Sequence, residues 1–310
     1  MTDNLFDRLA ELLQSEGPVN WRLAREIAES VSGQVEPIEP WIAEEYQELA
    51  HTAALLIDEA GPLDPAASTS IVHTVDRRGW ASANVDSFSY LGESLAGAFG
   101  GAGPLEGMLQ PLGPALIGMQ MGSTVGLMAH RVLGQFDVGL PAASGSGIYF
   151  VVPNIESFAT DHGLEIRQTR LWIALHEVAH QAQFAVPWIR DHYLALIREF
   201  LGNVRFDFEA MQQALEGVQD PSELEHMMSD PASLGGLVVD PAQQGTLEQI
   251  QAFMAAMEGS ADWLVERASG DLIPEGTRLR EAVDRRRAEP TQGEEALQRM
   301  LGLELKRSQY

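Results

Sequence analysis

Apolar residues recur at helical spacing along most of the chain. Near the N-terminus, Leu5, Leu9, Leu12 and Leu13 form one stripe, with the repeat of an amphipathic helix. The same pattern predicts helices at about 5–13, 20–31, 40–61, 80–97, 107–129, 167–185, 188–201 and 246–270, and a charged helix from 278 onward. We therefore expect a mainly α-helical fold.

Residues at the ends of these stretches are typical of helix termini. Asn20 can cap the second helix through its side chain, and Thr246 with Gln249 forms a capping-box pattern. Pro187 is expected to end the long helix before it, since the residue preceding a proline resists the α region. Gly270 is expected to end the helix that starts at Thr246.

One short segment has the pattern of a strand. Ile148, Tyr149, Phe150, Val151 and Val152 are β-branched or aromatic, and turn-forming residues lie on both sides. The stretch before it, 136–147, is rich in Gly, Ser and Pro and predicts a seam near residue 140. We expect a small β element and two halves, 1–140 and 141–310, joined in one compact unit.

The stretch 107–129 has no charged residue and is long enough to suggest a membrane span. However, Gln and Pro residues interrupt it, and His130 follows directly. Gly118, Gly122 and Gly126 recur every four residues and clear one face of a helix. In a membrane this spacing pairs helices, and in a water-soluble protein it lets a central helix contact its neighbours closely. We favour the buried helix of a soluble protein.

The amino-acid composition limits the kinds of catalytic site, metal site and partner that are possible. The chain has no cysteine, so disulfide bonds, thiolate zinc sites and cysteine nucleophiles are excluded, and His and carboxylate side chains must hold any transition metal. The net charge of −25 disfavours nucleic acid and anionic membrane surfaces as partners. The acidic N-terminus lacks the features of a secretory signal, which predicts a cytoplasmic protein.

The chemistry is concentrated in the segment His176-Glu177-Val178-Ala179-His180. Residues four apart project from the same face of a helix, so the two imidazoles can bind one metal ion, and Glu177 can act as the base for a metal-bound water. The surrounding helix is apolar, and unpaired polar groups there would be costly. The alternative is a pair of core histidines that bond to backbone groups or carboxylates.

A zinc site of this type needs a third protein ligand. His192 and His226 do not fall at the spacing of a third histidine, whereas Glu258 lies within an otherwise apolar helix with Asp262 one turn later. Glu258 could bind the metal, and Asp262 could accept the free ring N–H of a ligand histidine. The alternative is that Glu258 and Asp262 belong to a solvated helix face.

Together, the segment from His176 to His180 and the pair Glu258 and Asp262 resemble the glutamate-type zincins, in which a second helix carrying Glu-x-x-x-Asp joins the HExxH helix. More narrowly, the chain is similar to an actinobacterial family of zincin-like proteins, some of which are labelled hydrolases associated with coenzyme F420 biosynthesis. The similar segments are Trp80–Asn84, the glycine-spaced helix, Leu133–Pro141, His176–Trp188, Glu258–Gly259 and Leu301–Lys306.

The resemblance implies a zincin-like catalytic half at 141–310 after an N-terminal helical half. It implies that His176, His180 and Glu258 bind Zn²⁺ and that Glu177 is the base. Family members often carry His or Glu near the position of Asp262. They also continue past the residue that matches Tyr310, which implies that this chain is shorter than its relatives.

These expectations lead to a zinc-dependent hydrolase that uses metal-activated water, with a peptidase as the main hypothesis. By resemblance, the strand Ile148–Val152 would face the substrate, and an extended peptide could pair with it. Tyr149, His226 and Arg285 are all candidates for stabilising the oxyanion. Two alternatives remain: a hydrolase of a small non-peptide amide or ester, and a zincin-shaped module without catalytic activity. The sequence does not indicate an oligomeric state.

Overall fold

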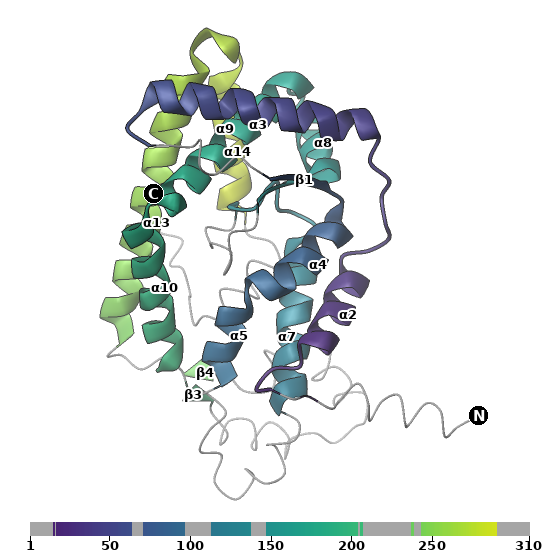
Figure 1. Cartoon of the computed structure of the whole chain (residues 1–310), viewed down its shortest axis with the longest axis vertical. Coiled ribbons are helices and arrows are strands. Elements are labelled where there is room, and N and C mark those ends of the chain that lie inside the picture. The colour runs from purple at the N-terminus through teal and green to yellow at the C-terminus, as the bar shows by residue number, and fades with distance from the viewer. Residues whose placement is uncertain are drawn as a thin grey trace, which may run out of the picture.

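The computed structural model in Figure 1 describes residues 15, 17–63, 71–96, 113–137, 147–203, 205–206, 237–238 and 243–289. Its helices are α2 (Trp21–Val31), α3 (Pro40–Ala60), α4 (Arg77–Ser87), α5 (Ser89–Ala96), α7 (Gly113–Met128), α8 (Val152–Asp161), α9 (Ile166–Ala185), α10 (Pro187–Gly202), α13 (Gln244–Ser269) and α14 (Gly276–Ala288). The strands are β1 (Val72–Val75), β2 (Ile148–Val151), β3 (Arg205–Phe206) and β4 (Leu237–Val238). The helices expected at 5–13 and after residue 289 lie outside the described residues.

The predicted start of α2 is confirmed, whereas two other predictions are wrong. The stretch expected as one helix from residue 80 begins at Arg77 and is divided at Phe88 into α4 and α5, and the helix expected to start at Thr246 begins earlier. Asn20 caps α2, because its Oδ1 accepts a hydrogen bond from the Leu23 N–H at 3.0 Å. In contrast, α13 begins two residues before Thr246, whose hydroxyl instead donates to Glu199 of α10 at 3.2 Å. At the other end of α13, Gly270 adopts a positive φ of 42°, which favours glycine and ends the helix as expected.

The glycine stripe of α7 brings this helix against α2. A Cβ on Gly122 would lie 3.0 Å from the Ala24 backbone Cα and closer still to its carbonyl oxygen. Gly118 meets Asn20 in the same way, and Gly126 meets Val31. The stripe therefore serves close helix packing inside the molecule. None of the described helices is long and apolar enough to cross a bilayer.

A two-stranded parallel sheet completes the mainly helical fold, as the sequence predicted in outline. β1 pairs with β2 from Val72 opposite Ile148 to Val75 opposite Val151. The chain leaves the strand one residue earlier than expected, because Val152 begins α8. The sequence analysis did not identify β1, whose four residues are only half-buried.

Apolar side chains gather in two core clusters. One joins α2, α4, α5 and α7 to α10, and the other joins α3, β2, α8, α9, α13 and α14. In Figure 1, α3 crosses one end of the molecule over α9, while α10 and α13 run side by side. Each cluster includes residues from both sides of position 140, so the division predicted there remains a prediction.

Candidate metal centre

The centre of the site is the middle of α9, which carries His176, Glu177 and His180. All three side chains are buried, because α3, α8 and α13 pack around α9. The two imidazoles project one helical turn apart, with ring centroids at 4.5 Å. The sequence pattern therefore becomes a pair of enclosed rings that lean toward α13.

The middle of α13 brings Glu258 to these rings. Glu258 Oε2 lies 3.7 Å from His176 Nε2, and Glu258 Oε1 lies 3.5 Å from His180 Nε2. One donor atom from each of the three residues falls within 4.8 Å of the other two. Glu258, which follows the two histidines by 78 and 82 positions, thus faces the same point as their rings.

Gln183 determines which nitrogen of His180 faces this point. Its amide Nε2 donates to the Met257 carbonyl at 2.9 Å and to the Ser260 hydroxyl at 2.8 Å. Its Oε1 therefore faces His180 Nδ1, at 3.0 Å, so Nδ1 must carry the hydrogen. His180 Nε2 then presents a bare lone pair, which is buried and has no hydrogen-bond partner in the described part of the chain.

His176 adopts the same tautomer for a different reason. Its ring stacks on Trp172 with centroids 5.2 Å apart, and its Nε2 lies 3.1 Å from Nη2 of Arg287 in α14. A guanidinium can only donate, so Nε2 is the acceptor and the ring hydrogen is on Nδ1. Both histidines therefore turn unprotonated Nε2 atoms toward Glu258.

The charge state of the cluster agrees with these tautomers. Burial, followed by the nearby His180, lowers the pKa of His176 below its ordinary value. Burial alone would raise the pKa of Glu258, but its close contacts with the His176 and His180 side chains outweigh burial and lower that pKa. Two imidazole nitrogens and one carboxylate form a donor set that a divalent metal ion such as zinc can take.

Glu177 faces the loop at 133–137 instead of α13. Its Oε2 accepts a hydrogen bond from the Phe136 N–H at 2.9 Å. A Cβ on Gly134 would lie 2.7 Å from Glu177 Cγ and closer still to the carboxyl group. Burial raises the pKa of Glu177 well above its usual range, and the charges of Asp137 and Glu258 add to this effect. The loop thus encloses a carboxyl group that binds a proton strongly.

Asp262 lies on the metal-facing side of His176. Its Oδ1 is 3.7 Å from His176 Nε2, the nitrogen that also faces Glu258, and its Oδ2 is 3.8 Å from Arg280. The expected role for Asp262 requires the opposite ring nitrogen. The supporting contact that fits this role is the one between Gln183 and His180.

The suspected substrate strand is partly occupied. β1 pairs along one edge of β2, and on the other edge Gly134 bridges to Phe150 while the Val151 N–H donates to the Leu133 carbonyl at 2.9 Å. Of the oxyanion candidates, Tyr149 stacks on His73 with centroids 4.5 Å apart, and His226 lies outside the described residues.

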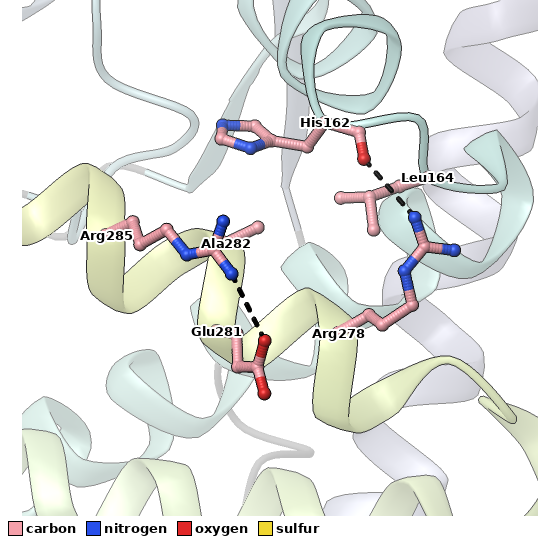
Figure 2. A pocket seen from close by; sticks show the side chains of 6 residues that line it. All are labelled: His162, Leu164, Arg278, Glu281, Ala282 and Arg285. Atoms are coloured by element: carbon pink, nitrogen blue, oxygen red, sulfur yellow. Dashed lines mark hydrogen bonds and ion pairs between the residues drawn. The ribbon is translucent and has the colours of Figure 1, made fainter.

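Arg285, the third oxyanion candidate, lines a separate surface pocket. Figure 2 shows this pocket between α14 and the turn after α8, with Arg285 paired to Glu281 at 3.3 Å and Arg278 directed toward the His162 carbonyl. The side chains that line it are His162, Leu164, Arg278, Glu281, Ala282 and Arg285. Arg287, two positions later on α14, reaches His176.

Sequence reasoning missed three residues of the site: Gln183, Gly134 and Arg287. Gln183 carried a usable signal, since it lies three residues after His180 on the same apolar helix. Gly134 and Arg287 carried none, because their roles depend on contacts between distant parts of the chain.

The comparisons with known proteins agree with this geometry. A family model described as zincin-like metallopeptidase matches residues 19–310. This chain belongs to the zincin-like metallopeptidase family. A crystal structure from Chloroflexus aurantiacus, described as "a putative hydrolase with a novel fold", is 29% identical, with a TM-score of 0.63 over 94% of this chain and 83% of the other. No curated protein matches this zincin-like chain significantly.

Proposed function

We propose that this zincin-like chain is a zinc-dependent peptidase with Glu177 as its general base. One observation carries the proposal: two unprotonated Nε2 atoms and the Glu258 carboxylate converge on one point. Glu177 lies on the same turn of α9 as the two histidines, and its carboxyl group is enclosed by the loop at 133–137. Two imidazoles and one carboxylate are the protein ligands of many hydrolytic zinc sites, which leave one position open for water or substrate.

The buried His180 Nε2 supports the presence of an ion. A buried nitrogen that lacks a partner loses its hydration without replacement, which typically costs about 1–3 kcal/mol. A metal ion would satisfy this lone pair and that of His176 together. When bound, zinc acts as a Lewis acid that acidifies water and polarises a carbonyl group.

Glu177 would act through proton transfer. Its raised pKa makes it a stronger proton acceptor than an exposed carboxylate, and a nearby divalent cation would favour its ionised form. In the proposed reaction, Glu177 takes a proton from the attacking water and passes it to the leaving amine. The Phe136 N–H binds one carboxyl oxygen and fixes the orientation of the Glu177 side chain.

The substrate part of the proposal is an amide in an extended chain. Backbone contacts occupy both edges of β2, and the Leu133–Gly134 backbone on one of them leads to Glu177. An extended peptide would therefore pair with this Leu133–Gly134 segment and lie over β2. The residues Ile148–Val152 remain our proposed substrate-facing strand, with Asp262 as a supporting residue of the metal centre.

Metal analysis combined with peptide digestion tests this proposal. We expect the purified protein to hold one zinc ion and to cleave members of a peptide library, and we expect Glu177→Gln to keep the zinc but lose cleavage by at least about 100-fold. Cleavage that survives in Glu177→Gln would contradict the role of Glu177. Bound zinc without peptide cleavage would favour a small amide or ester as substrate, or a module without catalysis.

A further inference from the structure

We propose that Arg287 controls metal binding at the candidate centre. Its guanidinium and a metal ion compete for the same two ligand atoms, so the ion binds only when the Arg287 side chain moves away from them. The inference rests on the proposed function, because it concerns the same three ligands. It adds a residue that controls how readily they accept a metal.

The contacts of Arg287 are with the ligand atoms themselves. Its Nη2 lies 3.1 Å from His176 Nε2 and donates to Glu258 Oε2 at 2.8 Å. A neutral imidazole has a single acceptor lone pair, so His176 cannot bind the guanidinium and an ion at once. The Glu258 oxygen is likewise held by a hydrogen bond between opposite charges, which is stronger than a neutral one.

Charge makes the competition stronger. The positively charged guanidinium offsets the negative charge of Glu258, which is mostly buried. A divalent cation between the same ligands would neutralise Glu258 in its place and would repel the guanidinium at close range. Arg287 therefore stabilises the metal-free protein and weakens metal binding.

The surroundings of Arg287 allow a movement of the side chain alone. The neighbouring Arg286 binds Asp137 at 2.6 Å and also the Arg131 carbonyl, which holds the end of α14 against the loop at 133–137. The Arg287 side chain itself is 31% exposed. It can rotate toward solvent while the helix stays in place, so metal loading requires no unfolding of α14.

The zinc affinity of Arg287→Gln, measured by competition with a chelator of known affinity, tests the inference. We expect this variant to bind zinc at least about tenfold more tightly than the wild type, since it lacks a charge-assisted contact that stabilises only the metal-free state. In EDTA it should melt at a lower temperature, and zinc should raise its melting temperature more than it does for the wild type.

Arg285→Gln is the matched control, because Arg285 lies on the same helix and pairs with Glu281 on another face. It should bind zinc within about twofold of the wild type. If Arg287→Gln does not fold, Arg287→Lys should still bind zinc more tightly, because an ammonium group forms a poorer contact with the two ligand atoms.

Three outcomes would overturn the inference. Unchanged zinc affinity in a folded Arg287 variant would contradict the competition and leave the proposed function standing. Weaker zinc binding would show that Arg287 supports the site. Absence of zinc binding in both wild type and variant would contradict the metal centre, and with it the proposed function.

Discussion

At the scale of the residue, a glycine decides how closely the loop at 133–137 can approach α9. Gly134 lies against the carboxyl group of Glu177 with no space for a side chain, while two positions later the Phe136 N–H binds the same carboxyl group. The carboxyl group of Glu177, our proposed general base, is therefore positioned by the backbone of a segment that lies about 40 residues earlier in the chain.

Gly134→Ala should disturb the base and leave the ligands in place. The added methyl group must displace either the Glu177 carboxyl group or the loop, and overpacking of this kind costs about 1–3 kcal/mol. We expect lower stability in urea unfolding, loss of peptide cleavage and unchanged zinc content. Gly259→Ala is the control, since its Cβ would meet no atom within 4 Å. A fully active Gly134→Ala would show that Glu177 does not need this position.

Gln183 allows a second prediction about the ligands. Replacement by Leu keeps the approximate volume but removes the acceptor for His180 Nδ1–H, so the ring is free to turn or to change tautomer. Substitutions of residues that orient metal ligands typically lower metal affinity about 10–100-fold. We expect a loss in this range for Gln183→Leu in a chelator competition. An affinity within twofold of the wild type would contradict the proposed role of Gln183.

The sequence could indicate the candidate ligands, because the pattern that marks them is local. His176, Glu177 and His180 are read from one helical turn, and Glu258 was the polar residue that an apolar helix made conspicuous. Arg287 could not be found in this way. It lies in a highly charged helix with three consecutive arginines, and only packing shows that the third one meets His176, 111 positions away.

At the scale of the element, the spacing of glycines along the sequence predicted a structural feature correctly, whereas a capping-box pattern misplaced a helix start. The four-residue glycine repeat predicted a helix with one flat face, and α7 uses that face against α2. The capping box at Thr246 was wrong, because α13 extends two residues further toward its N-terminus and the threonine binds α10 instead. β1 was missed because four half-buried residues have no strong periodicity.

Gly122→Ala tests the contact between α7 and α2. In an isolated helix this substitution would stabilise by about 0.5–1 kcal/mol, but here the methyl group would meet the Ala24 backbone. We expect a net loss of about 1–3 kcal/mol in urea unfolding. Gly245→Ala lies in the first turn of α13 with no atom within 4 Å of its Cβ, so it should be neutral or stabilising. Equal behaviour of the two variants would contradict the close packing.

At the scale of the whole molecule, the C-terminal end of α14 joins parts of the fold that no local pattern connects. Arg286 binds Asp137 across 149 positions of sequence, and the Leu133 N–H binds the same carboxylate at 2.9 Å. The loop that encloses Glu177 is thereby tied to the helix that carries Arg287. The surroundings of Glu177 and of Arg287 both depend on this largely buried ion pair, which the sequence could not predict because acidic and basic residues occur throughout the chain.

This ion pair gives stability a pH dependence of known sign. Burial alone would raise the pKa of Asp137, but the Arg286 guanidinium outweighs it and lowers the pKa from 3.8 to about 2. A carboxyl group whose pKa is depressed in the folded state stabilises the protein above its unfolded pKa, and this contribution disappears as the pH falls through the folded pKa. For Asp137, the loss should occur between about pH 4 and pH 2, and its size is about 2 kcal/mol.

Comparison of the wild type with Asp137→Asn isolates this effect. The chain carries 45 acidic residues, so acid changes the charge of the whole surface in both proteins, and the difference between their free energies of unfolding removes that common part. We expect Asn at this position to be destabilising at neutral pH, because it leaves Arg286 without its carboxylate. The difference in free energy of unfolding between the wild type and Asp137→Asn, measured in urea, should decrease by about 2 kcal/mol as the pH falls from 4 to 2. A difference that stays constant over this range would mean that Asp137 keeps an ordinary pKa and that its pairing with Arg286 does not hold α14 against the loop.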